Sequence, residues 1–454
     1  MAGLVRVFAP SRANLFCLLL GSTLLPAADW PHWHGPQRDS VWRETGILEK
    51  FPESGPPIRW RTPIAAGYSS PAVAAGRIYL TDRPDSQTRG NAGNALERTA
   101  ETGRERVLCL AESDGRVLWQ FEYECSYHIS YPAGPRASPA VAGDRVYTLG
   151  AEGHLHCLEA ATGRVLWARD FKKDYGAKTQ LWGFAAAPLV DGDRVICVVG
   201  GAQHTVVAFD GATGRELWQS LPPREPAYST PIIIEAGGTR QLLVWDAEEL
   251  SSLDPTTGRV HWSAPFKTKH GHAIGTPRRA GDFLLVSSFF DGSLLLRLEP
   301  TRPAATEVWR IRGPNESRPE GLHSLMSTPF IEDGHIYGVC SFGQLRCLEL
   351  ATGRRVWETF APTTGGKPLR WATAFLVKHE NRYFIYNETG DLIIARLSPA
   401  GYEELSRTHL LEPTNRAGAR PVHWSHPAFA NRSIYARNDR EILCADLRAP
   451  TGRP

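Results

Sequence analysis

The chain has 454 residues and a formal net charge of +3, from 51 basic and 48 acidic side chains. A charge balance this close to neutrality gives no electrostatic reason to expect a nucleic-acid partner or an anionic membrane surface. Its eight cysteines form no CxxC pair, no CxxCH haem attachment and no zinc-ligand spacing. We therefore predict no metal site and expect the cysteines to be packing residues.

Residues 1–28 have the pattern of a secretory signal peptide. Arg6 and Arg12 precede an apolar run over residues 15–25, and small residues around Ala28 suit cleavage. The run is shorter than the roughly 20 apolar residues that span a bilayer, so no transmembrane segment is predicted. Removing the leader leaves 49 basic and 48 acidic residues, a net charge of +1. We expect an exported protein, periplasmic or extracellular.

Residues 29–57 form an aromatic arm. Trp30, Trp33 and Trp42 stand there beside Gly-Pro and Pro turns. Aromatic side chains bury a large apolar area when they pack. We expect the arm to lie across the rest of the molecule, where it would cover apolar surface and cap one mouth of a central funnel. A partner-binding tail is the alternative.

Residues 58–447 contain a repeat that ends in tryptophan. Five copies carry a Gly-Arg turn just before that residue, and they end at Trp119 (SDGRVLW), Trp167 (ATGRVLW), Trp218 (ATGRELW), Trp262 (TTGRVHW) and Trp357 (ATGRRVW). Trp60 and Trp309 take the same place without the turn, which gives intervals of 59, 48, 51, 44, 47 and 48 residues. A period in this range is typical of propeller blades or helical arrays.

The composition of one copy decides between these two architectures. In residues 136–171 the β-rich runs SPAVA, RVYTLG, HLHCLEA and RVLWARDF are separated by GD, AEG and ATG, the pattern of four antiparallel strands. No copy has room for the paired helices of a helical repeat. A four-stranded sheet repeated around an axis is a β-propeller. We expect the repeated tryptophans to fill the wedge between adjacent sheets.

The period also predicts the number of blades and how the ring closes. Ser406 occupies the next tryptophan position, and residues 426–447 supply three further strands before the chain ends. IRWRTPI around Trp60 is a final strand without three strands before it. We therefore predict an all-β, eight-bladed propeller closed by pairing of N-terminal and C-terminal strands. Residues 83–106 are a polar insertion in the first blade, where ALERTA should form a helical turn, and residues 448–454 are a tail.

Candidate functional residues lie in the loops that lead from the outermost strand of one blade to the innermost strand of the next. These loops emerge on one face around the central channel, and they are long and unlike one another. The candidate ligand-binding residues on them are Tyr131, Arg136, Lys178, Trp182, His272, His323, Arg370, Trp371, Trp424 and His426. Rings beside Arg, Lys and His suit a sugar face, an aromatic cofactor or an anionic polymer. Alternatively, these rings pack on one another and plug the funnel.

The repeated phrase LEAATGRVLW resembles the repeat of the pyrroloquinoline-quinone (PQQ)-type β-propellers, over residues 58–447. That family includes the quinoprotein alcohol dehydrogenases and the BamB-type outer-membrane assembly lipoproteins. The dehydrogenase resemblance implies PQQ over a calcium ion, beneath a disulfide of two adjacent cysteines, with an aspartate as base. This chain has no adjacent cysteine pair. The BamB resemblance implies a non-catalytic scaffold, although the lipid-attachment cysteine of that group is missing here.

Two functions are compatible with these patterns. The first is an exported, monomeric binding scaffold that recognises a protein or a glycan through its loop-rich face and carries no cofactor. The alternative is an enzyme in the funnel, either a divergent oxidoreductase that uses PQQ with calcium or a carbohydrate-active protein. For such an enzyme, Tyr131 and His272 are the candidate acid and base, and no GxSxG nucleophile motif is present.

Overall fold

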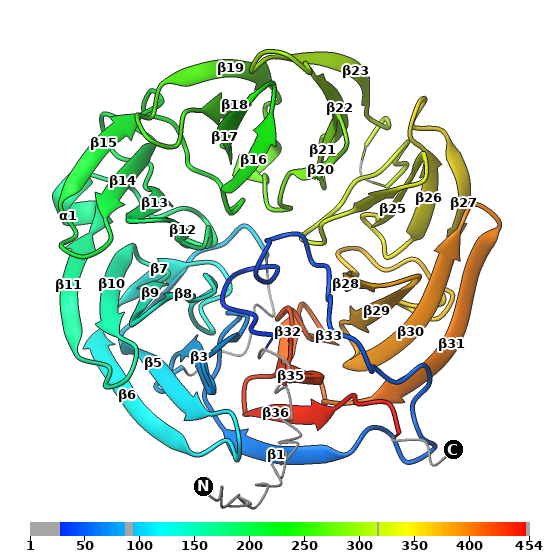
Figure 1. The fold of residues 1–454 in the computed structure, drawn as a ribbon, viewed down its shortest axis with the longest axis horizontal. Coiled ribbons are helices and arrows are strands. Elements are labelled where there is room, and N and C mark those ends of the chain that lie inside the picture. Colours follow the sequence, from blue (N-terminus) through cyan, green and yellow to red (C-terminus); the bar gives the residue numbers. More distant parts are fainter. Residues whose placement is uncertain (1–27, 87–93, 316, 451–454) are drawn as a thin grey trace, which may run out of the picture.

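The computed structural model describes residues 28–86, 94–315 and 317–450. Over these residues the strands form eight four-stranded antiparallel sheets arranged around one axis (Figure 1). The predicted all-β, eight-bladed propeller is confirmed. The predicted leader lies outside the described residues except for Ala28, and so do the last four residues of the tail.

Each blade is a meander whose strands follow one another outward from the axis, except that the last blade takes its outer strand from the N-terminal side. The strands of the first four blades are β2 (Ala72–Ala74), β3 (Arg77–Asp82), β5 (Arg104–Ala111) and β6 (Val117–Glu124); β8 (Ala140–Ala142), β9 (Arg145–Leu149), β10 (His154–Glu159) and β11 (Val165–Asp170); β12 (Leu189–Asp191), β13 (Arg194–Val198), β14 (Val206–Asp210) and β15 (Glu216–Ser220); and β16 (Ile232–Ala236), β17 (Thr239–Trp245), β18 (Glu249–Leu253) and β19 (Val260–Pro265). Those of the last four are β20 (Arg278–Ala280), β21 (Phe283–Ser288), β22 (Gly292–Leu298) and β23 (Ala305–Ile311); β24 (Phe330–Glu332), β25 (His335–Val339), β26 (Leu345–Glu349) and β27 (Arg355–Thr359); β28 (Ala374–His379), β29 (Arg382–Asn387), β30 (Asp391–Ser398) and β31 (Gly401–His409); and β34 (Ala428–Ala430), β35 (Ser433–Arg437), β36 (Glu441–Asp446) and β1 (Ile58–Pro63).

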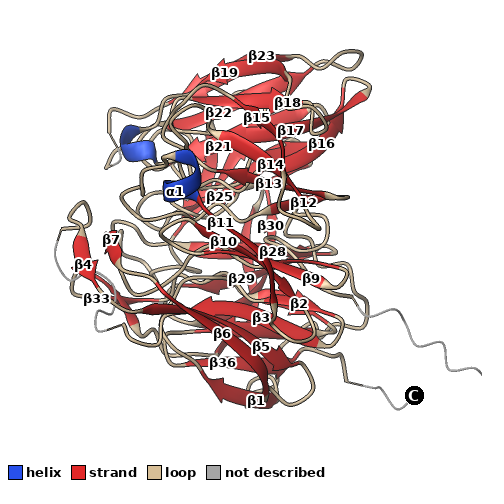
Figure 2. Ribbon diagram, turned by 90° about the vertical axis from the view of Figure 1, so that its left-hand side faces the viewer, coloured by secondary structure: helices blue, strands red, loops and turns tan. Residues whose placement is uncertain are grey.

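A few small elements decorate one face of the ring. They are the strand pair β4 (Thr99–Glu101) and β7 (Tyr127–Ile129), the pair β32 (Asn415–Ala417) and β33 (Arg420–Val422), the helix α1 (Phe171–Tyr175) and the 3-10 turn Lys269–Gly271. Figure 2 shows α1, β4, β7 and β33 projecting on the same side of the molecule. Of the helices in the described residues, none is long and apolar enough to cross a membrane.

The ring closes by pairing the two ends of the propeller sequence. Strand β1 pairs antiparallel with β36, with Trp60 opposite Cys444 and Pro63 opposite Glu441. This pairing, which the sequence predicts, completes the eighth blade and covers an edge that could otherwise pair with another chain. Ser406 in β31 takes the tryptophan position of the seventh blade. Its hydroxyl instead accepts a hydrogen bond from the Phe51 backbone N–H, at 2.9 Å.

Five of the seven repeated tryptophans donate a hydrogen bond to the next blade. Trp119 is 9% exposed, and its indole N–H donates to the Ala160 carbonyl in the turn of the following blade, at 3.0 Å. Equivalent bonds run from Trp60 to Glu112, Trp167 to Gly211, Trp309 to Leu350 and Trp357 to Ser398. Trp262 bonds to Gln241 of its own blade instead. The predicted wedge packing is confirmed.

The contact with the tryptophan of the preceding blade also explains why the repeated turn has a glycine. Gly163 has φ +76°, and a Cβ atom there would stand 2.5 Å from the Trp119 ring. Gly143, in another turn of the same blade, also has a positive φ (+59°), but a Cβ atom there would meet nothing within 4 Å. The turn therefore needs glycine both for its backbone angle and for the tryptophan that rests on it.

We predict that Gly163→Ala destabilises the protein more than Gly143→Ala does. The positive φ costs about 1–2 kcal/mol in both variants, and displacing the Trp119 ring adds about 1–3 kcal/mol at residue 163 alone. Urea denaturation of the two variants measures the difference in unfolding free energy. Equal losses would contradict the role assigned to the tryptophan contact.

The cysteines are buried and none forms a disulfide in the described part of the chain, as expected of packing residues. Cys109, Cys157, Cys347 and Cys444 lie on the third strands of their blades, where side chains point into the wedges between sheets. Burial raises the pKa of the Cys157 thiol to about 12. A thiol that stays protonated is a poor nucleophile, so this position contributes packing rather than reactivity.

Candidate functional site

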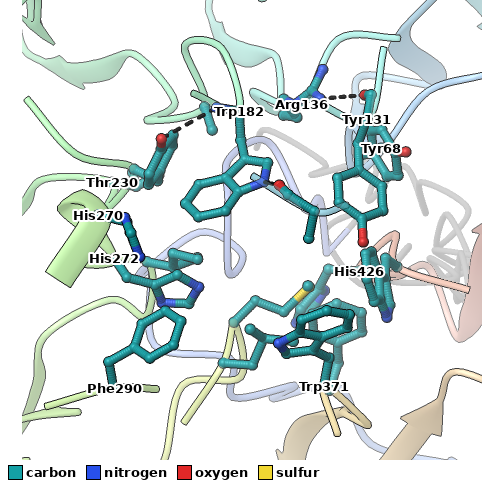
Figure 3. A pocket seen from close by; sticks show the side chains of 18 of the residues that line it. Tyr68, Tyr131, Arg136, Trp182, Thr230, His270, His272, Phe290, Trp371 and His426 are labelled. Atoms are coloured by element: carbon teal, nitrogen blue, oxygen red, sulfur yellow. Dashed lines mark hydrogen bonds between the residues drawn. The ribbon is translucent and has the colours of Figure 1, made fainter. Parts of the chain in front are cut away.

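The loops between outer and inner strands surround a pocket at the propeller axis, with a cavity volume of about 340 Å³. All eight of these connections contribute to its lining. One lining residue from each, in chain order, is Tyr68, Tyr131, Trp182, Tyr228, His272, Leu325, Trp371 and Trp424. Figure 3 shows several of these side chains pointing into the same space. The volume lies at the lower end of the range of about 300–1,000 Å³ found for ligand pockets.

Eight of the ten candidate residues line this pocket: Tyr131, Arg136, Trp182, His272, Arg370, Trp371, Trp424 and His426. The other two do not. Lys178 is exposed and follows helix α1, before the chain reaches the axis at Trp182. His323 is fully buried, where its Nδ1 lies 2.9 Å from the Phe289 carbonyl and its Nε2 accepts from the Gly313 N–H. His323 therefore has a structural place outside the funnel.

Several lining residues are not among the ten candidates named from the sequence. They are Trp33, Tyr68, Asn94, Ala95, Leu96, Ser138, Tyr228, Thr230, Lys269, His270, Phe290, Leu325, Met326 and Phe375, together with small and aliphatic neighbours. Two of them could have been found from the sequence. Tyr68 and Tyr228 begin the similar phrases YSSP and YSTP, each just before an inner strand. Aligning the starts of the inner strands would have found both.

The arm of residues 29–57 forms the floor of the pocket. It contacts inner strands around the ring through backbone or arginine hydrogen bonds, in the pairs Trp30–Val73, Pro31–Val141, Arg38–Val190, Asp39–Arg278 and Trp42–Lys378. Inner strands begin at the loop-rich face. Asp29 accepts from the Ala75 N–H, just after β2 ends, and Lys378 lies near the end of β28, so the arm reaches the opposite face. In Figure 1 the dark-blue segment crosses the centre of the ring. The funnel is therefore closed by the arm at this end.

Trp33 carries the arm into the pocket itself. Its indole N–H donates to the Thr276 hydroxyl at 3.0 Å, and its ring stacks on His34 with centroids 4.4 Å apart. The edge of His426 lies against the same ring, at 5.2 Å between centroids. Burial lowers the pKa of His426 to about 4 and keeps that of His34 well below its ordinary value, so both imidazoles are neutral at physiological pH.

The insertion of residues 83–106 contributes part of the wall. Residues 94–96 line the pocket, and the Ala95 carbonyl accepts from the Trp182 indole N–H at 3.1 Å and from the Ser130 hydroxyl at 2.8 Å. The predicted helical turn in ALERTA is wrong. Residues 95–96 form a turn and Thr99–Glu101 is strand β4, because pairing with β7 and three bonds from Arg98 to backbone carbonyls outweigh local helix propensity.

The candidate acid and base are poorly tuned for catalysis near neutral pH. Burial lowers the pKa of His272 to about 3 and raises the pKa of Tyr131 to about 12. General acid-base catalysis works best when the pKa lies near the working pH. Both groups therefore hold their neutral forms, and they serve as hydrogen-bonding groups of the wall.

Positive charge dominates the ionisable groups of the lining. Among the described lining residues, Arg136, Lys269 and Arg370 are cationic side chains and none is Asp or Glu. Arg136 donates to backbone carbonyls, including that of Ser130 at 2.9 Å, which leaves its charge uncompensated by an acid at that contact. Arg370 lies 4.9 Å from the centroid of the Trp371 ring.

The lining does not fit a calcium-bound quinone. Calcium takes six to eight oxygen ligands in proteins, with carboxylates prominent among them. The described pocket lining offers no carboxylate, and the described residues contain no group of three or more His, Cys, Asp or Glu side chains placed to hold a metal ion. The chain also lacks the adjacent cysteine pair that the dehydrogenase resemblance implies.

Comparisons with known proteins agree with the fold and with the repeat. BamB of Burkholderia pseudomallei (strain K96243) is 26% identical over 49% of this chain and 54% of its own length. The quinohemoprotein alcohol dehydrogenase ADH IIB of Pseudomonas putida is 30% identical, over 30% of this chain and 21% of its own length. The chain thus spans about half of the length of the BamB relative and a fifth of the dehydrogenase.

Solved structures share the architecture at low sequence identity. BamB from Moraxella catarrhalis aligns with TM-score 0.50 and 17% identity, covering 82% of this chain and 98% of that one. The quinohemoprotein alcohol dehydrogenase from Comamonas testosteroni aligns with TM-score 0.59 and 12% identity, covering 94% and 82%. At these identities the likeness concerns the fold alone.

A sequence match to a protein family identifies the chain more specifically than the structural likenesses, which concern only the fold. Outer membrane protein assembly factor BamB is the family matched, and the match covers residues 103–359. That range includes the turns and tryptophans of the repeat from Trp119 to Trp357. Because the match extends over more than half of the chain, this protein belongs to the BamB family of PQQ-like repeat propellers.

Proposed function

We propose that this chain is an exported, non-catalytic binding protein that holds a partner protein at its loop-rich face. The observation that carries the proposal is the convergence of all eight inter-blade loops on one pocket whose far end is closed by the arm. A pocket closed at one end accepts a protruding group from one side. Membership of a family named for an assembly factor supports a partner of protein type.

The chemistry of the lining favours a protein over a glycan. Trp182, Trp371 and Trp424 stand with tyrosines and arginines around the pocket, and these three residue types are the ones enriched at the energetic centres of protein interfaces. A sugar presents many hydroxyl groups that each need a hydrogen-bond partner, and the described lining provides no carboxylate to serve them. We therefore place a protein ahead of a glycan as the partner.

A funnel enzyme is the less favoured function. Its candidate acid and base have pKa values of about 12 and about 3, far from the working range. The calcium that a quinone would require finds no carboxylate ligand in the described lining. A binding role needs neither group, and it uses the aromatic walls directly.

Site-specific photo-crosslinking tests the proposal. Leu96 at the pocket and Val260 at the start of outer strand β19, on the opposite face, are each 43% exposed and form a matched pair. A photoreactive amino acid at residue 96 should yield a discrete adduct with an envelope protein in producing cells, whereas the same group at residue 260 should not. Equal adducts from both positions, or none from either, would refute docking at the loop-rich face.

A further inference from the structure

Tyr131 stands at the pocket in a backbone conformation that bulky residues rarely adopt. Its φ is +55°, in the left-handed region, and its ring lies against that of Trp424 with centroids 5.5 Å apart. This conformation is costly for a residue that has a Cβ atom. Such strain persists where surrounding contacts over-determine it, and it is concentrated at binding and catalytic sites. The contacts that hold Tyr131 therefore bear on what the pocket does.

Arg136 supplies those contacts. Its two terminal nitrogens donate to the backbone carbonyls of Ser130, at 2.9 Å, and of Tyr131 and Gly134. Figure 3 marks the bond between Arg136 and Tyr131. Hydrogen bonds from a charged donor are stronger than those between neutral groups. Arginine presents its donors in a rigid planar fork, whereas lysine is a point charge on a flexible stem. The turn therefore depends on the shape of the guanidinium as well as on its charge.

The same turn also holds a second ring of the lining, that of Tyr68. The Pro135 carbonyl accepts from the Tyr68 backbone N–H at 2.8 Å, and the Arg136 guanidinium lies 5.1 Å from the centroid of the Tyr68 ring. Tyr68 and Tyr131 come from neighbouring loops between blades, and Figure 3 shows both at the same side of the pocket. Arg136 thus connects the two loops that present these rings.

This part of the wall offers ring surface rather than charge. The Tyr68 hydroxyl donates to Asn415 Oδ1 at 3.2 Å, and the Trp424 indole N–H donates to Glu388 at 3.2 Å. Burial raises the pKa of Tyr131 to about 12, so its hydroxyl stays neutral. Aromatic rings give favourable edge-on and offset contacts to an apolar or aromatic group that packs against them.

We infer that Arg136 is a positioning residue, which fixes Tyr68 and Tyr131 for an apolar group of the partner protein and forms no ion pair with that partner. The inference rests on the proposed function, and it names the kind of group that this part of the loop-rich face recognises. Loops that are ordered before binding lower the entropic cost of association. Arg136, a candidate ligand-binding residue from the sequence, thereby acts through the two rings that it holds.

Fluorine NMR of a fluorinated tyrosine placed at residue 131 alone tests the positioning. The wild-type protein should give one resonance, separate from that of the urea-unfolded chain. Arg136→Lys keeps the charge and loses the fork, so it should move this resonance toward the unfolded position. The control is Arg116→Lys, at a side chain that is 70% exposed on an outer turn, and it should leave the resonance in place. An unmoved resonance in Arg136→Lys would overturn the inference.

Two small probes separate positioning from ion pairing. N-acetylphenylalaninamide is neutral, and N-acetylphenylalanine adds a carboxylate to the same ring. Titrations followed by the resonance at residue 131 should show that Arg136→Gln weakens both probes by the same factor, roughly fivefold, because the variant disorders the rings. If Arg136 paired with the carboxylate, N-acetylphenylalanine would lose roughly tenfold more affinity than the amide, and the inference would be wrong. Absence of saturable binding to the wild type would also overturn it.

Gly134→Ala disturbs the same turn while the guanidinium stays in place. A Cβ atom at residue 134 would stand 2.4 Å from the Ala66 carbonyl oxygen, so the two loops would have to separate. We expect this variant to move the resonance at residue 131 and to weaken both probes, as Arg136→Gln does. Wild-type affinity in a folded Gly134→Ala protein whose resonance has moved would show that binding does not depend on the held rings.

The two proposals fail separately. An adduct at residue 96 together with an unmoved resonance in Arg136→Lys would leave the partner-binding function standing and would remove the role of Arg136. A moved resonance and weakened probes without an adduct would keep Arg136 as the residue that holds the rings, and would remove the partner protein as the source of the apolar group.

Discussion

Replacing Trp42 with alanine should lower the free energy of unfolding by about 3–5 kcal/mol, the usual range for removing a buried tryptophan. Trp42 is 2% exposed and lies against His379, Phe384 and Phe429, with ring centroids 5.1–5.3 Å away. These partners belong to the seventh and eighth blades, so the arm fastens the closing region of the ring. Urea denaturation followed by circular dichroism measures the loss.

Trp424→Ala is the matched control for that variant. Trp424 is partly exposed at the pocket, where it contacts Tyr131 and donates to Glu388 at 3.2 Å. Its removal should cost about 1–2 kcal/mol, since a partly exposed side chain leaves a smaller cavity. If the two variants lost the same stability, the arm would contribute no more to the fold than a pocket side chain.

Acidification should destabilise the protein well above the pH at which carboxylates titrate. Burial lowers the pKa of His423 and of His426 to about 4, whereas the unfolded chain takes up these protons near pH 6.5. When folding lowers the pKa of a group, that group's contribution to the free energy of unfolding is complete above the unfolded pKa. The contribution is lost as the pH falls toward the folded pKa. Each of these two pKa shifts corresponds to a loss of at most roughly 3 kcal/mol in the free energy of unfolding.

The urea midpoint measured between pH 7.5 and pH 5 should therefore fall steadily below about pH 6.5. His426→Phe removes one titrating group and keeps a ring between Trp33 and Phe375, so it should reduce this slope. A midpoint that is independent of pH in this window would contradict the burial of neutral His423 and His426.

The fold could be predicted because one contact causes the repeat. In four of the five Gly-Arg turns a Cβ atom on the glycine would stand 2.5–2.6 Å from the tryptophan of the preceding blade, as at Gly163 and Trp119. The pairing of turn glycine and tryptophan therefore recurs in the sequence at a nearly constant spacing. The closing strand followed from the same reasoning, since Trp60 had a blade position but no blade of its own.

The site could be predicted in part, because loops from outer to inner strands must surround the axis. Which side chain of a loop turns inward depends on tertiary contacts that have no sequence period. His323 lies in such a loop but is held by the Phe289 carbonyl, and Trp33 reaches the pocket from an arm outside the repeat. The turn at Ala95 likewise depends on bonds from Trp182 and Ser130, which come from distant parts of the chain.

The decisive measurement is the affinity of the partner captured at residue 96 for the wild-type protein and for Trp182→Ala, by isothermal titration calorimetry. A tryptophan at the centre of an interface contributes 2 kcal/mol or more, so the variant should bind about 30-fold more weakly while its circular dichroism spectrum is unchanged. An unchanged affinity in a folded Trp182→Ala protein would mean that the partner binds elsewhere on the propeller and that the pocket has another role.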